Sequence, residues 1–99
     1  MPSLKNILRE IRKELKEKEK IRENAQKNMR KATSLSKQAI LLIHQKKLEE
    51  AKKLVQDAKE ILSQLNKLSV KYPDIIDGGL FDSALQEYSE ANIFLNLVE

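Results

Sequence analysis

Residues 3–45 contain neither glycine nor proline, and this uninterrupted stretch constrains the fold more than any other feature of the chain. Apolar or small residues recur in it every three or four positions, at Leu4, Leu8, Ile11, Leu15, Ala25, Met29, Ala32, Ala39 and Ile43. Polar residues fill the remaining places of the same stripe, at Lys18, Arg22 and Ser36. The spacing predicts one long amphipathic helix, or two helices with a soft join near residues 24–28.

The ends of this helix can also be read from the sequence. Pro2 and Ser3 suit a helix start, and residues 44–47, with one histidine and two lysines, suit a helix end followed by a turn. An unbroken helix of this length extends ~65 Å at ~1.5 Å per residue. A chain of 99 residues cannot cover such a rod. Its first turns are therefore expected to project or to pack on another subunit.

Two further helices are predicted downstream. Apolar residues mark a helix over residues 48–70, at Leu48, Ala51, Val55, Ala58, Leu62, Leu65 and Leu68. The short connection before it predicts an antiparallel hairpin, and Tyr72-Pro73 ends it. After a loop over residues 74–79, the third helix is expected to begin between Gly79 and Ser83, because Ser83 and Gln86 have capping-box spacing. The prediction is an all-α antiparallel bundle of three helices, with residues 1–99 as a single helical domain.

Composition excludes several other classes. Aromatic residues are only 4% of the chain, and two Gly and two Pro are too few for the turns of a β-sandwich or barrel. The absence of cysteine excludes disulfides and thiolate metal sites, and one histidine cannot by itself form a zinc site. The longest apolar run, residues 39–43, is far shorter than a membrane-spanning helix. A cytoplasmic protein that does not act at a membrane is expected.

Charge is distributed unevenly along the chain. Residues 1–47 carry fourteen Lys and Arg against five Glu, a balance of +9, whereas residues 48–99 carry five Lys against ten Asp and Glu, a balance of −5. A basic N-terminal helix attracts phosphates, and an acidic C-terminal part can hold a divalent cation. The alternative is a solvated helix of mixed charge, since the five glutamates weaken the positive field.

The third helix carries two carboxylates, Glu87 and Glu90, at i and i+3 spacing. This spacing places them on one helix face, close enough to share a cation. They belong to a second stripe beside the main apolar face, comprising Ser83, Glu87, Glu90, Phe94 and Leu97. The helix is therefore expected to be buried on two sides. Mg²⁺ held by one or two carboxylates can support phosphodiester cleavage, whereas the alternative is exposed glutamates paired with lysines of a neighbouring helix.

The core of this helix, Ala84-Leu85-Gln86-Glu87-Tyr88 followed by Glu90-Ala91, resembles the signature of the translin/TRAX family, particularly its TRAX-like and archaeal members. Residues 34–44, where a Ser-Lys pair precedes an apolar run ending in Ile-His, are similar to the first-helix segment of the family. Residues 48–51 and the loop over 72–79 are similar in kind and order. The resemblance covers residues 3–99.

This resemblance implies a translin-like, ring-shaped or barrel-shaped oligomer formed by self-association or with a related translin-type subunit. It implies binding of single-stranded RNA or DNA and Mg²⁺-dependent endoribonuclease activity in the complete form, with Glu87 and Glu90 as catalytic residues that hold Mg²⁺. A further acid of the family lies in later helices, so the chain corresponds to the N-terminal half of a member.

Local candidates for nucleic-acid contacts are basic residues of the first helix. They are Arg9, Arg12, Lys13, Lys16, Arg30, Lys31 and Lys37. With so few aromatic residues, base stacking is expected to be sparse and binding to rest on phosphate contacts.

Two other functions are compatible with the sequence. The first is a non-catalytic helical-hairpin module for protein interaction or oligomerisation. The second is a coiled-coil scaffold formed by the first helix, which the polar residues Lys18, Arg22 and Ser36 at seam positions weaken.

Overall fold

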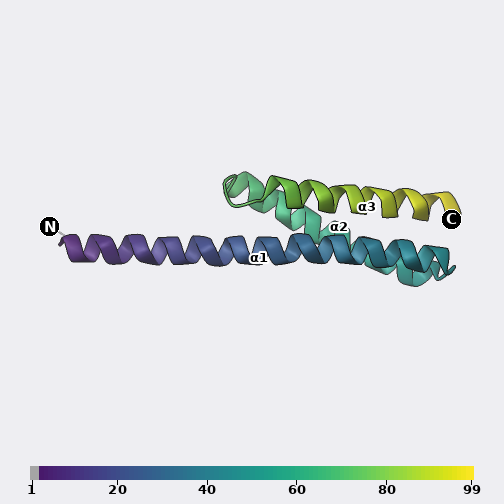
Figure 1. Cartoon of the computed structure of the whole chain (residues 1–99), viewed down its shortest axis with the longest axis horizontal. Coiled ribbons are helices and arrows are strands. Elements are labelled where there is room, and N and C mark those ends of the chain that lie inside the picture. Colours follow the sequence, from purple (N-terminus) through teal and green to yellow (C-terminus); the bar gives the residue numbers. More distant parts are fainter. Residues whose placement is uncertain (1–2) are drawn as a thin grey trace.

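A computed structural model describes residues 3–99 as three helices without a strand: α1 (Leu4–His44), α2 (Leu48–Lys71) and α3 (Gly78–Val98). α2 runs back along α1, and α3 runs forward again beside it (Figure 1). The predicted all-α bundle of three helices is thus confirmed. Ser3 begins α1 as its N-cap, because its side chain accepts a hydrogen bond of 3.2 Å from the Asn6 backbone N–H. Pro2 lies outside the described residues.

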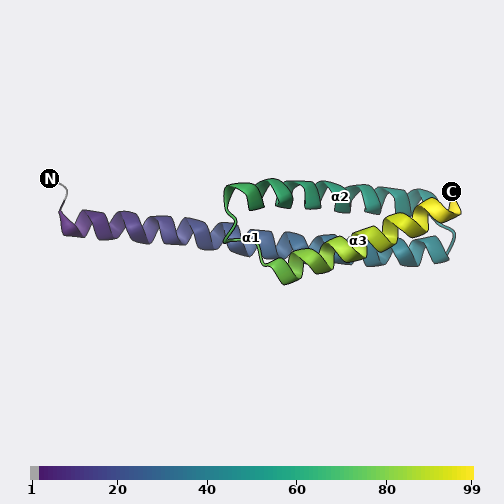
Figure 2. The same cartoon turned by 90° about the horizontal axis from the view of Figure 1, so that it is seen from above.

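α1 is one continuous helix, so the join considered near residues 24–28 does not form. The molecule measures 66 × 17 × 16 Å, and α1 extends along its longest axis. α2 and α3 cover only the C-terminal part of α1 (Figure 2). Every residue from Ser3 to Lys20 is exposed. We call residues 4–20 the arm, which projects from the bundle in the single chain, and its packing on another subunit stays a prediction.

The core lies where all three helices meet, and much of it is alanine. Fully buried alanines occur on every helix, at Ala25, Ala32, Ala39, Ala51, Ala58, Ala84 and Ala91. Such small side chains let the helix axes approach closely, while Met29, Leu65 and Ile75 are the largest fully buried apolar side chains. Ile75 comes from the loop between α2 and α3, and its burial anchors that loop against the arm end of the bundle.

The two connections differ in how closely they follow the sequence prediction. The α1–α2 turn lies at the predicted place, and Lys46 takes a positive φ of 63° there. The predicted start of α3 is wrong: the helix begins at Gly78, and Ser83 lies inside it. Asp77 is the N-cap, since its carboxylate accepts a 3.1 Å hydrogen bond from the Leu80 backbone N–H. A carboxylate before two glycines therefore starts the helix earlier than the Ser83–Gln86 spacing indicated.

α3 is buried on one side only, which corrects the prediction of two buried sides. Ala84, Ala91 and Leu95 face the core, whereas Phe94 is 41% and Leu97 76% exposed. The second stripe remains outside because three helices provide partners for only one side of α3. At its end, Lys52 of α2 lies 2.8 Å from the Glu99 carboxylate, and this hydrogen bond, with the charge of Glu49, raises the pKa of Lys52.

Candidate nucleic-acid interface

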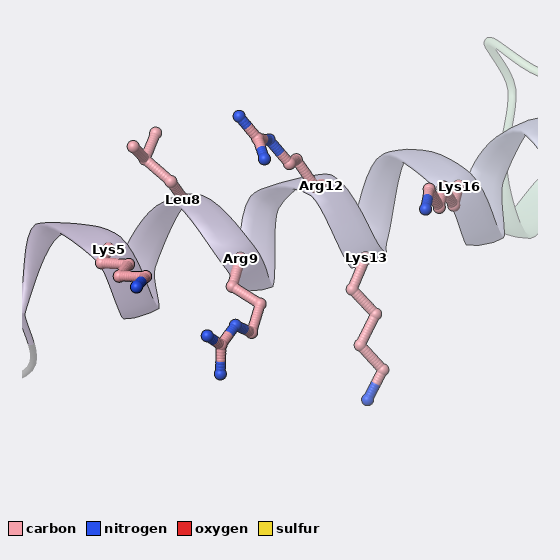
Figure 3. A pocket seen from close by; sticks show the side chains of 6 residues that line it. All are labelled: Lys5, Leu8, Arg9, Arg12, Lys13 and Lys16. Atoms are coloured by element: carbon pink, nitrogen blue, oxygen red, sulfur yellow. The ribbon is translucent and has the colours of Figure 1, made fainter.

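The basic side of the arm is the first part of the candidate interface. The side chains of Lys5, Leu8, Arg9, Arg12, Lys13 and Lys16 extend from it and delimit a hollow of 540 Å³ (Figure 3). Arg9 and Lys13 point to one edge of this hollow, and Leu8 and Arg12 to the other. Because all six residues belong to one helix, the hollow is an open surface. It can accept an extended chain of phosphates, but it cannot enclose a small molecule.

Charges on the arm are segregated by the helical repeat. At 100° per residue, the basic residues that line the hollow fall on one side, and Glu10, Glu14 and Glu17 fall on the flank beyond Lys13. Glu19 is paired with Arg22 at 3.1 Å. Among residues 3–99, the ion pairs involve none of the five cations around the hollow. The glutamates therefore do not neutralise this side, and its cations are available to phosphates.

The structure divides the seven predicted basic residues among three places. Four of them, Arg9, Arg12, Lys13 and Lys16, lie together on the arm. Arg30 and Lys37 lie farther along α1, in a pocket shared with α3, whereas Lys31 lies on the α2 side beside Asp57 and Glu60. Lys5 was missing from the prediction. Its spacing of four from Arg9 was the signal that would have found it.

The pocket between α1 and α3 is the second part of the candidate interface. It measures 360 Å³ and combines charged, polar and apolar groups. Its lining consists of Arg30, Thr33, Ser34, Lys37, Gln38, Leu80 and Ser83. The Gln38 side-chain amide donates a 3.2 Å hydrogen bond to the Ser34 hydroxyl, which holds both groups at the pocket wall. Arg30 and Lys37 form none of the ion pairs within residues 3–99.

The predicted metal ligands lie near this pocket. Glu87 follows Ser83 by one turn of α3 and is half-buried, and Glu90 is exposed. Neither forms an ion pair with a lysine within residues 3–99, so the alternative of glutamates paired with a neighbouring helix does not occur there. No group of three or more His, Asp or Glu side chains in this described part of the chain gathers around one point. The two carboxylates stand alone on the surface of α3.

Comparison with known proteins does not assign the chain to a family. No protein-family model matches the chain, and no match to it was found among the curated proteins or the solved structures. No helix within residues 3–99 is long and apolar enough to cross a membrane. The geometry alone thus defines the class: an all-α three-helix bundle with a projecting, charge-segregated arm.

Proposed function

We propose that this protein binds single-stranded nucleic acid, RNA in particular, and that it does so as a protein of the translin/TRAX type. The observation that carries the proposal is the cluster of unpaired cations on the basic side of the arm. Phosphate contacts supply most of the affinity in sequence-independent binding, and exposed Lys and Arg side chains provide them. With aromatic residues at only 4%, stacking contributes little.

The experiment is a fluorescence-anisotropy titration of labelled single-stranded RNA across a salt series. The arm variant replaces Arg9, Lys13 and Lys16 by Gln. The matched control replaces three exposed lysines of α2 by Gln and so removes the same net charge; they are Lys53, Lys59 and Lys67. We expect the RNA affinity of the wild type to fall as the salt concentration rises. The arm variant should bind at least ~10-fold more weakly, and its affinity should depend less steeply on salt. Equal losses in both variants would show that net charge, rather than the arm, attracts the RNA.

In its complete form, we propose, the protein is a Mg²⁺-dependent endoribonuclease, with Glu87 and Glu90 as the residues that hold the ion. Two carboxylates three residues apart on an accessible face fit the ligand set of Mg²⁺, which takes one or two carboxylates and fills its shell with water and phosphate oxygens. Mg²⁺ supplies charge neutralisation at the phosphate and lowers the pKa of a bound water. Arg30 and Lys37 line a pocket with Ser83, one turn of α3 before Glu87, and we propose that they orient a strand toward these carboxylates.

A calorimetric titration with Mg²⁺, followed by a gel assay of RNA cleavage, tests this second step. The Glu87→Gln/Glu90→Gln variant is compared with Glu14→Gln/Glu17→Gln, an exposed pair of the same spacing on the arm. We expect loss of Mg²⁺ binding and of cleavage in the first variant alone. Unchanged Mg²⁺ affinity in that variant would remove these residues from the proposal while leaving RNA binding intact.

A second candidate function is that of a self-associating interaction module. The apolar seam of the arm favours it, since Leu4 is 72% and Leu15 62% exposed, with Leu8 and Ile11 between them. The seam continues the stripe that α2 and α3 cover farther along α1, and it has the spacing of a coiled coil. Light scattering over a range of concentrations tests it, and a strictly monomeric species at the highest concentration would exclude it.

A further inference from the structure

We infer that the pocket between α1 and α3 is a ribonucleotide subsite, which makes strand binding selective for RNA over DNA. This inference rests on the proposed function, and it assigns to the pocket a role that the arm cannot perform. Cations on the arm contact phosphates, which RNA and DNA share. The pocket adds hydroxyl, amide and apolar groups, which are the groups that contact a sugar and a base.

The two cations of the pocket lie two helical turns apart on α1. Arg30 and Lys37 are separated by seven residues, which places them on the same side of α1 and ~10 Å apart along its axis. One phosphate fits naturally at each cation, with the nucleoside between them. The position of the charges therefore favours one unit of a phosphodiester chain over a single inorganic anion.

Between these cations the lining carries no charge, and most of its surface is apolar. Hydroxyls of Ser34 and Ser83 face the pocket from α1 and α3, together with the Gln38 amide and the apolar side chain of Leu80. Hydroxyl and amide groups both donate and accept hydrogen bonds, as the ribose 2′-hydroxyl does. DNA lacks that hydroxyl and cannot form these hydrogen bonds, and the exposed serine hydroxyls then remain bound to water. Leu80 offers the base an apolar surface.

A strand that binds the arm can reach this pocket without leaving α1. Basic residues repeat every seven positions along the side of α1 that faces away from its buried stripe, first as Lys13, Lys20 and Lys27. Beside them, Arg9, Lys16, Arg30 and Lys37 share one heptad register, in which Glu23 occupies the intervening position, so that Lys20 and Lys27 bridge the interval. Because residues seven apart nearly align on a helix, these cations form a track from the arm to the pocket.

The test compares RNA and DNA strands of identical sequence with one pair of variants. Ser34→Ala/Ser83→Ala removes the two pocket hydroxyls, and Ser89→Ala is the control, an exposed serine of α3 outside the pocket. All three serines are exposed, so each variant is expected to fold. We expect the pocket variant to lose about five- to tenfold in RNA affinity and nothing in DNA affinity. The control should change neither.

A second measurement addresses the pocket without the arm. A ribonucleoside 3′,5′-bisphosphate is titrated into ¹⁵N-labelled protein, and its 2′-deoxy counterpart is titrated in parallel. We expect the ribo form to shift the amide resonances of Ser34, Gln38 and Ser83, and the deoxy form to shift them less. The inference would be overturned if the pocket variant lost equal affinity for RNA and DNA, or if both bisphosphates shifted the resonances equally. Either result would leave strand binding by the arm untouched. Failure of the wild type to bind either strand would instead overturn the proposed function.

Discussion

The Ser36 hydroxyl donates a 2.8 Å hydrogen bond to the Ala32 carbonyl, one turn earlier in α1, and the whole Ser36 side chain is buried. This bond explains how a polar residue occupies the apolar stripe that faces α2 and α3. The hydroxyl satisfies its hydrogen-bonding capacity within its own helix, so it needs no partner across the interface. Its small volume keeps the helices close at that level.

We therefore expect Ser36→Ala to change the free energy of unfolding by less than about 1 kcal/mol, since the Ala32 carbonyl keeps its backbone partner. Ser36→Leu should destabilise the bundle by about 1–3 kcal/mol, because the site has no room for the larger side chain. Urea unfolding monitored by circular dichroism measures both. If Ser36→Ala lowered the free energy of unfolding by more than about 2 kcal/mol, the hydroxyl would have to form a stabilising contact outside α1.

Two apolar residues of one stripe should respond very differently to truncation. Met29 is fully buried, whereas Leu15 on the arm is 62% exposed. We expect Met29→Ala to cost about 2–5 kcal/mol in unfolding free energy, and Leu15→Ala to stay within about 0.5 kcal/mol in the monomer. Denaturant titration at low protein concentration gives both values. A large cost for Leu15→Ala at that concentration would mean that the arm is covered in solution.

The start of α3 can be tested at its cap. Asp77→Ala removes the side chain that accepts from the Leu80 N–H and should cost about 0.5–2 kcal/mol. Ser83→Ala, at the position that the capping-box spacing indicated, should change stability by less than about 0.5 kcal/mol. Thermal and urea unfolding of the two variants distinguish the caps. The reverse order would place the helix start at Ser83.

RNA binding and self-association should depend on salt in opposite ways. From Ile21 onward, α2 and α3 cover the side of α1 along which the apolar seam continues. Two copies that pair through this seam therefore overlap through their arms, in antiparallel orientation. A two-fold axis then brings the basic flanks of both arms together, and their like charges repel. Salt screens this repulsion, whereas it weakens phosphate binding.

We expect the weight-average mass from light scattering to rise with salt and concentration, while RNA affinity falls with salt. Ile11→Gln/Leu15→Gln should abolish the rise and keep the RNA affinity, because neither residue carries charge or lines the basic hollow. A mass that falls as salt increases would indicate pairing through opposite charges and would exclude this antiparallel arrangement.

Much of the architecture could be predicted from local chemistry. Three features predict the three helices: the absence of Gly and Pro over residues 3–45, the stop at Pro73 and the spacing of apolar residues. For most of the helix ends, the predicted residue lies within about one position of the observed one. The grouping of four cations on the arm could also be predicted in this way, whereas the role of Glu87 and Glu90 stays a prediction. These features depend on backbone propensity and helical repeat, which neighbouring residues determine.

Other features depended on the packing of the whole chain. The same apolar spacing continues from Leu4 to Ile43, yet only the part from Ile21 onward is covered, because α2 and α3 do not extend over the apolar side of the arm. Packing also separated Lys31 from Arg30 and Lys37, and joined the latter two to Ser83 in one pocket. The sequence by itself determined which residues form helices, since that depends on local interactions. Only the tertiary structure decided which faces remain open to a ligand, since that depends on which distant helix lies against each of them.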